Sequence, residues 1–239
     1  MKALENLWVT VSVIFTIKIC CAFGRYSEVF PANYNKYEPP VYQGNPAHLY
    51  INLEILDIDR IDESRMEFSI QTYIIEFWRD WRLNLSSYTF VGGQAFPQTL
   101  VPDLWNPDLV FDNAKSGVLF SLSVPNTNMV VANDGLTLIR SSRYNLVIGC
   151  QMNFLYYPMD TQLCFFKLAL FSNSDKVTLH WSDEDGNPNR RPKAITFANE
   201  IQALKYKIEQ PKTHKTKEQW SSVLGSGCEV VPLASTSQP

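Results

Sequence analysis

Apolar and polar residues alternate along residues 49–55, and this period of two is the strongest constraint on the fold. One face of the extended chain carries four aliphatic residues, Leu49, Ile51, Leu53 and Ile55. The intervening positions are Tyr50, Asn52 and Glu54. Because successive side chains of a β-strand point to opposite faces, this pattern predicts a half-buried strand.

A second alternating segment runs from residue 66 to residue 78. Its second face also carries apolar side chains, at Tyr73, Ile75 and Phe77. A strand that is apolar on both faces needs cover on both. We therefore expect another part of the chain to lie over the outer face of this strand.

Short strands are expected at residues 109–111, 118–124 and 129–132, a long strand at 136–149, and further strands at 164–171, 177–181 and 195–208. Within the last of these, residues 198–204 fit a helical turn as well as a strand. Asn133-Asp134-Gly135 predicts a hairpin turn, because Asp-Gly tolerates positive φ. Residues 57–63 are expected to form a charged turn, and residues 32–36 one helical turn. With no long amphipathic helix, the predicted fold is all-β: an antiparallel immunoglobulin-like β-sandwich with a short N-terminal helical segment.

Charge and motif content exclude several functional classes. The chain has 21 Lys and Arg against 24 Asp and Glu, for a net charge of −3, so no nucleic-acid partner is expected. No nucleophile elbow or phosphate-binding loop is present, so we expect neither an enzyme nor a cofactor. The three histidines, His48, His180 and His214, show no metal-ligand spacing, and no metal site is expected.

The N-terminus has the pattern of a secretory signal peptide. Residues 7–17 are an apolar run, and small residues follow up to Gly24. The run is shorter than the ~20 residues that span a bilayer. We expect a signal peptide over 1–24, entry into the secretory pathway, and an extracellular or cell-surface location. The folded domain is then expected over 25–223, with an incomplete last strand and a divergent, disordered tail over 224–239.

Signal cleavage would remove Cys20 and Cys21. In an oxidising compartment the expected disulfide is Cys150–Cys164, with 13 residues between the cysteines, which leaves Cys228 as the odd one. The sequon at Asn84 predicts N-glycosylation of a surface loop.

Three segments together resemble one family. They are the stretch from Cys150 to Cys164 around Tyr157-Pro158-Met159-Asp160, the element Trp105-Asn-Pro107-Asp108, and the run Glu76-Phe-Trp78-Arg-Asp80-Trp-Arg82-Leu83. In order and spacing they resemble the Cys-loop pentameric ligand-gated ion channels. The resemblance covers residues 47–222, the extracellular ligand-binding domain. Met159 is similar to the anion-channel branch and its invertebrate relatives.

Physics alone leaves two readings of the loop between the cysteines. The first is a structural disulfide whose loop packs inward against the core. The second is a rigid loop that presents its aromatic residues to a partner surface. The resemblance implies the second, a coupling loop that rests on a pore domain. It assigns this role to Tyr157, Pro158, Met159 and Asp160, with Asp59 in the neighbouring segment.

The resemblance also implies a small-molecule neurotransmitter site between adjacent subunits. One side takes Asp112, Phe171, Tyr206 and Trp220, and the other takes Tyr73, Ile75, Ser141 and Arg143. Aromatic walls suit an ammonium ligand through cation–π attraction. Ordinary roles stay open for each residue: packing for the aromatic ones, turn capping for Asp112, and a solvated strand face for Ser141 and Arg143.

Relatives gated by amino acids place an arginine at the Ile75 position, and Ile75 makes no charge-assisted bond. We therefore expect an amine such as acetylcholine rather than glutamate, GABA or glycine, while Arg143 keeps an anionic ligand open. Expected partners are related subunits in a homo- or hetero-oligomer, with the membrane reached only through a full-length parent or partner subunits. The alternatives are a soluble decoy or assembly-interfering fragment, and a secreted β-sandwich lectin or adhesion module.

Overall fold

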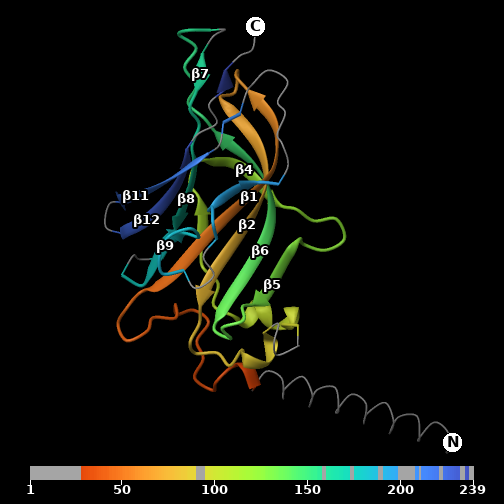
Figure 1. Cartoon of the computed structure of the whole chain (residues 1–239), viewed down its shortest axis with the longest axis vertical. Coiled ribbons are helices and arrows are strands. Elements are labelled where there is room, and N and C mark those ends of the chain that lie inside the picture. The colour runs from red at the N-terminus through yellow and green to blue at the C-terminus, as the bar shows by residue number, and fades with distance from the viewer. Residues whose placement is uncertain are drawn as a thin grey trace, which may run out of the picture.

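The computed structural model describes residues 28–89, 95–157, 160–172, 175–187, 191–198, 208–209, 211–220, 223–231 and 235–236. Side chains are described as far as residue 213. This part of the chain is nearly all β (Figure 1). Its helical pieces are residues 28–29 and two short 3-10 helices, η1 (Ser86–Tyr88) and η2 (Gln98–Asp103). The all-β prediction is confirmed.

The larger sheet has seven strands. Three long ones form its centre: β1 (Ala47–Asp62), β2 (Glu67–Arg79) and β6 (Thr137–Gly149). The others are β4 (Ala114–Leu119), β5 (Thr127–Val131), β9 (Val177–Trp181) and β10 (Ile195–Phe197). The order is β10-β1-β2-β6-β4, with β5 also on β6 and β9 also on β1. Strands β9 and β10 run parallel to β1, so the sheet is mixed rather than purely antiparallel.

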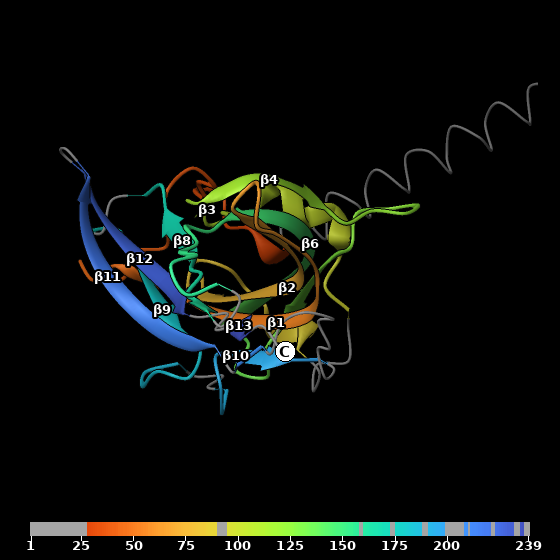
Figure 2. The same cartoon turned by 90° about the horizontal axis from the view of Figure 1, so that it is seen from above.

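A second sheet has the order β11-β12-β8-β3. Its members are β3 (Leu109–Phe111), β8 (Phe166–Leu170), β11 (Lys212–Trp220) and β12 (Val223–Val231). Seen from above, β8, β11 and β12 lie beside the sheet that holds β1, β2 and β6 (Figure 2). A short pair, β7 (Thr161–Gln162) with β13 (Ser235–Thr236), completes the strands.

The core fills the space between the two sheets, and the period of two explains why. Leu49 lies opposite Trp78 and Leu53 lies opposite Ile74 across β1 and β2, so their side chains share the inner face. The second sheet contributes buried residues of β8, among them Leu168. Burial of such a side chain is worth about 1.5–3 kcal/mol, so the alternating strands supply most of the driving force for folding.

The predicted turn at residues 57–63 is wrong, because β1 continues to Asp62. Its register with β2 shifts twice, between Ile55 and Asp57 and between Ile58 and Arg60. Each bulge resets which side chain faces the core. Ile58 is therefore buried although exposed charged residues flank it on both sides. The reversal of the chain comes only at residues 63–66.

The predicted disordered tail is also wrong in part. Residues 223–231 form β12, which pairs along its length with β11 and across residues 227–230 with β8. Its partner strand β11 takes in residues 212–220. The free edge of β8 accounts for this difference, because an unpaired edge is a template for another strand.

Smaller differences concern boundaries. Residues 32–36 are not helical and contain a turn closed by the Tyr34 N–H on the Pro31 carbonyl. Strand β4 spans Ala114–Leu119, whereas the predicted strand is 118–124. Strand β10 spans Ile195–Phe197, and residues 199–207 of the predicted strand 195–208 lie outside the described residues. The predicted signal peptide at 1–24 lies outside the described residues.

Candidate functional site

Two of the three sequence motifs pack against each other. The rings of Trp78 and Trp105 meet edge to face, with centroids 6.2 Å apart. Asp80 is fully buried and accepts two hydrogen bonds from the Arg82 guanidinium, at 2.8 and 2.7 Å. The Tyr34 hydroxyl donates to Asp80 and accepts the Trp105 backbone N–H. These contacts fix the chain that leads into β3.

The pKa values around Asp80 follow from this packing. Burial raises the pKa of the Tyr34 hydroxyl, and the Asp80 carboxylate raises it further. Burial acts to lower the pKa of Arg82, but the hydrogen bond and charge of Asp80 raise it overall. The Arg82 guanidinium therefore stays charged beside a neutral tyrosine at physiological pH.

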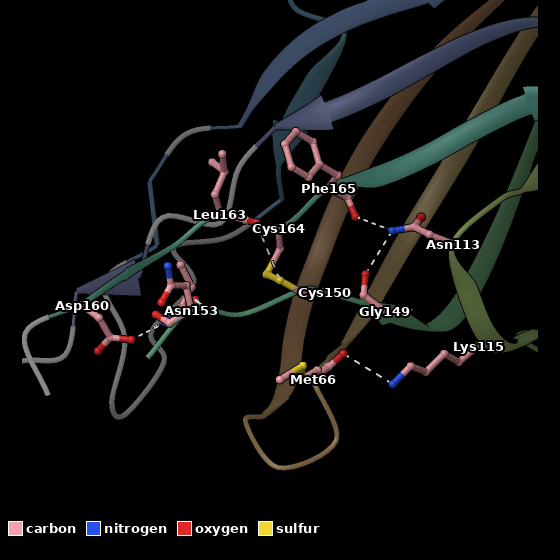
Figure 3. The surroundings of a disulfide bond; sticks show 11 residues. Met66, Asn113, Lys115, Gly149, Cys150, Asn153, Asp160, Leu163, Cys164 and Phe165 are labelled. Carbon is pink, nitrogen blue, oxygen red and sulfur yellow. Dashed lines mark hydrogen bonds between the residues drawn. A yellow bond between two sulfur atoms is a disulfide. The ribbon is translucent and has the colours of Figure 1, made fainter. Parts of the chain in front are cut away.

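The disulfide between Cys150 and Cys164 is present, with Cα atoms 5.0 Å apart (Figure 3). The loop that it closes is held internally by Gln162. The Gln162 side chain bonds the Asn153 N–H at 2.7 Å and the Asn153 carbonyl at 2.8 Å, and it donates to Asp160. The expected bridge is thus confirmed, and a buried amide braces the two limbs of the loop.

The tip of this loop is solvent-exposed. Leu155 is 74% exposed, Tyr156 73% and Tyr157 64%, whereas Phe154 packs against the core. The loop begins beside the β1–β2 turn, because the Cys150 N–H donates to the Met66 carbonyl at 2.9 Å (Figure 3). The two segments assigned to coupling therefore meet at one end of the molecule.

Asn113 joins this end to the second sheet. Its side-chain amide donates to the carbonyls of Gly149 and Phe165, at 3.1 and 2.7 Å (Figure 3). Its Oδ1 accepts a hydrogen bond from the Lys167 N–H at 2.9 Å. The three hydrogen bonds of this one side chain thus join the end of β6, the residue that follows Cys164, and β8.

Four predicted site residues share one face of the larger sheet. Tyr73 lies directly opposite Arg143, and Ile75 lies directly opposite Ser141, across β2 and β6. Opposed residues of an antiparallel pair project to the same side. We call these four residues the β2–β6 face; all of them are partly exposed.

The polar groups of the β2–β6 face are already oriented. The Arg143 guanidinium lies 4.1 Å from the Phe120 ring centroid and donates to Gln71 at 2.8 Å. Its Nε is buried without a hydrogen-bond partner. The Tyr73 hydroxyl accepts a hydrogen bond from Asn126 at 3.3 Å. The face therefore holds one cation, the Arg143 guanidinium, which contacts an amide and an aromatic ring.

The other predicted half of the site lies on the second sheet, where the structure separates Phe171 from Asp112. Phe171 follows β8, is 81% exposed, and donates its N–H to the Asp108 carbonyl. Asp112 lies beyond the opposite end of β3, where its N–H donates to the Lys167 carbonyl. Asp108, which contacts Phe171, and Asp112 are four positions apart along the extended chain, which corresponds to roughly 13 Å at about 3.3 Å per residue.

Comparison with known proteins agrees with these features. The family profile described as neurotransmitter-gated ion-channel ligand binding domain matches residues 25–224. The chain belongs to this family.

Named relatives of this ligand-binding domain are receptor subunits. The gamma-aminobutyric acid receptor subunit rho-3 of Rattus norvegicus is 29% identical over 172 residues, which cover 72% of this chain and 35% of the relative. The pi subunit of Bos taurus is 28% identical over 195 residues, covering 80% and 41%. The glycine receptor subunit beta of Homo sapiens is 30% identical over 155 residues, covering 62% and 31%. The chain thus spans less than half the length of these relatives.

Some predicted site residues cannot be assigned a place. Tyr206, Pro158 and Met159 lie outside the described residues, and Trp220 is described only as the backbone end of β11. Asp59 is exposed near the end of β1 and accepts both hydrogen bonds from the Gln71 amide. Asn84 is exposed, and the Ser86 hydroxyl of the same sequon donates to its Oδ1 at 3.0 Å.

Sequence reasoning missed Asn113 and Gln162. Their types are common in turns, and only the fold shows that each bridges separate backbone segments. It also missed Asp108 as the neighbour of Phe171, since that contact depends on the β3–β8 register.

No helix in the described part of the chain is both long and apolar enough to cross a membrane. No group of three or more His, Cys, Asp or Glu side chains there is placed to hold a metal ion.

Proposed function

We propose that this ligand-binding domain takes a small-molecule neurotransmitter at the seam between two subunits. The observation that carries the proposal is the location of its two half-sites. The β2–β6 face lies on the larger sheet, and exposed Phe171 lies on the second sheet beside β3. Each half is open at the surface, so a neighbouring subunit would complete it.

An amine is the favoured ligand. Ile75 lies at the centre of the β2–β6 face beside Ser141, and it offers no charge to a carboxylate. Phe171 presents an exposed ring, which suits an ammonium group at ~0.5–2 kcal/mol. Asp108 is exposed next to Phe171 and is better placed than Asp112 to balance the positive charge.

An amino acid is the second candidate, because of Arg143. The guanidinium lies directly opposite Tyr73 and has a buried, unpaired Nε. Relatives of the chain are named as receptors for gamma-aminobutyric acid and glycine. A ligand carboxylate facing Arg143 would gain a charge-assisted hydrogen bond of about 1.5–3 kcal/mol.

Assembly and location follow from the same proposal. A site shared between subunits requires an oligomer with copies of this chain or with related subunits, and the disulfide fits an extracellular, cell-surface setting. The exposed residues 155–157 would then face a pore domain in a full-length partner. Family membership replaces the lectin or adhesion module as an explanation of the sandwich.

Binding to the purified, secreted chain tests the proposal. Acetylcholine, GABA and glycine are titrated by calorimetry against the natural chain, Phe171→Ala and Arg143→Gln. Amine binding that is lost in Phe171→Ala but kept in Arg143→Gln supports the first candidate. Amino-acid binding that is lost in Arg143→Gln supports the second. An oligomeric chain that binds none of the three overturns the proposed site.

A further inference from the structure

Two of the three histidines, 132 positions apart in the sequence, lie side by side in the fold. Strand β9 runs parallel to β1, with His48 opposite Thr178 and Tyr50 opposite His180. In this register His48 Nδ1 approaches His180 Nε2 to 3.1 Å. The two rings meet edge to face with centroids 5.0 Å apart.

A hydroxyl completes a triangle of donor atoms. The Thr178 Oγ1 lies 2.8 Å from His48 Nδ1 and 3.0 Å from His180 Nε2. Ligands of a tetrahedral Zn²⁺ ion at about 2.0–2.1 Å from the metal are separated by roughly 3.3 Å. The three atoms are therefore spaced as three neighbouring ligands are, with only a slight widening needed.

The far side of His180 has the support that a metal-binding histidine needs. His180 Nδ1 lies 3.2 Å from Glu184 Oε2, and the second oxygen of Glu184 accepts the Trp181 N–H at 2.9 Å. A carboxylate on the other ring nitrogen fixes the tautomer that leaves Nε2 for the metal. Glu184 is thus a positioning residue for His180.

The group is open to solvent on one side and packed on the other. His48 is exposed, whereas Thr178 and His180 are partly buried. The buried ring of Tyr50 backs both histidines, with centroids 6.4 Å from His48 and 5.2 Å from His180. An ion can enter from the exposed side, where water would supply the remaining ligand.

We propose that His48, His180 and Thr178 bind a divalent transition-metal ion such as Zn²⁺. Imidazole nitrogen favours Zn²⁺, Cu²⁺ and Ni²⁺ and disfavours Mg²⁺ and Ca²⁺. With two histidines and one hydroxyl, the site is open and exchangeable rather than a closed structural zinc site. A bound ion would tie β9 to β1 and stabilise the folded state by mass action.

The site lies apart from the disulfide loop. Strand β9 and the first residues of β1 lie away from the end that carries β7 (Figure 1). The prediction of no metal site rested on sequence spacing, which carries no information about parallel pairing over this distance. The inference holds whether or not the chain binds a transmitter.

Titration of the whole secreted chain with ZnCl2 alone, by calorimetry and thermal unfolding, tests the proposal. We expect one site per chain, a rise in Tm with Zn²⁺, and no response to MgCl2. His48→Ala and His180→Ala should each weaken Zn²⁺ binding at least tenfold. His214→Ala is the matched control and should leave it unchanged. Equal binding by the natural chain and both single variants overturns the proposal.

Ring-nitrogen NMR of the natural chain guards against variants that fail to fold. Zn²⁺ should shift the resonances of His48 Nδ1 and His180 Nε2 and leave those of His214 in place. In Glu184→Gln we expect weaker binding together with a changed tautomer signal of His180. Zn²⁺ shifts confined to His214, or none at all, would rule out the site.

Discussion

Glu76 and Arg140 form a buried ion pair directly opposite each other on β2 and β6. Arg140 Nε lies 2.5 Å from Glu76 Oε2, and Nη2 lies 2.6 Å from Oε1, so the contact is bidentate. Arg140 also donates to Asn106 Oδ1 at 3.1 Å, which ties the pair to the Trp105–Asp108 motif. Burial acts to lower the pKa of Arg140, but the Glu76 charge raises it overall.

Removal of one partner should therefore be costly. We expect Glu76→Gln to lower the free energy of unfolding by about 3–5 kcal/mol, because it leaves the Arg140 charge buried without a counter-ion. Urea denaturation at fixed protein concentration measures this. Lys36→Ala is the control, since the Lys36–Asp103 pair is solvent-exposed and worth no more than ~1 kcal/mol. Similar losses in both variants would contradict the argument.

The disulfide should contribute through the length of the loop that it closes. Replacing Cys150 and Cys164 together by serine should cost about 3 kcal/mol, as expected for a loop of about 15 residues. Tyr156→Ser, at an exposed position in the same loop, should change stability by less than about 0.5 kcal/mol. Chemical denaturation of both variants against the natural chain separates the covalent effect from loop packing. A double variant as stable as the natural chain would show that the bridge is dispensable.

Sequence periodicity predicted strands whose pattern is set by burial. The bounds of β3 and β9 match the prediction, and the alternation in β1 and β2 matches their inner faces. It failed for β12, where Gly225, Ser226 and Gly227 interrupt any apolar pattern and pairing with β8 decides the structure. The local sequence pattern of a segment does not reveal that the edge of a distant strand is free to pair with it.

In the candidate site, too, relationships within one strand were predictable from the sequence, whereas relationships that depend on strand pairing were not. The resemblance put Tyr73, Ile75, Ser141 and Arg143 on one side of the expected site, and the β2–β6 register brings these four residues to one face of the larger sheet. It grouped Asp112 with Phe171, although the β3–β8 register sets them at opposite ends of the ladder. The histidine pair depends on a parallel pairing that no spacing rule predicts.

Asn113 should be essential for the junction between the sheets. Asn113→Ala removes three hydrogen bonds, two to the carbonyls of Gly149 and Phe165 and one from the Lys167 N–H, so we expect a loss of about 2–3 kcal/mol. Asn128→Ala, at an exposed position, is the matched control and should cost well under 1 kcal/mol. Hydrogen exchange should show faster opening at Lys167 in Asn113→Ala. Unchanged protection there would mean that the amide is not what holds the junction.

Asn84 should carry the glycan. The side chain is exposed and oriented by Ser86, and Asn84-Leu85-Ser86 is the one sequon of the sequence. Expression in a eukaryotic secretory system should give a chain whose mass falls on treatment with an endoglycosidase. Asn84→Gln and Ser86→Ala should both abolish that change, whereas Ser87→Ala should not. A mass shift that persists in Asn84→Gln would place the sugar elsewhere.

Acid should weaken the β5–β6 hairpin through Asp134. Burial acts to raise the pKa of this carboxyl, but hydrogen bonds from Thr137, Leu136 and Arg79 lower it below its usual value. A depressed folded-state pKa means that the carboxylate stabilises the fold above the unfolded pKa of about 3.9, and that this contribution disappears as pH falls through the folded value.

Asp134→Asn should therefore be less stable than the natural chain at pH 7, and this stability difference should shrink as the pH falls below about 4 and through the lowered folded-state pKa of Asp134. Arg79→Gln removes one hydrogen-bond donor to Asp134, the exposed guanidinium of Arg79. In an Arg79→Gln background, Asp134→Asn should therefore cost less stability at pH 7, although part of the loss should remain. Urea unfolding measured at a series of pH values gives the slope directly. If the stability difference between Asp134→Asn and the natural chain stayed constant across this range, the carboxylate would not be the titrating group that holds the turn.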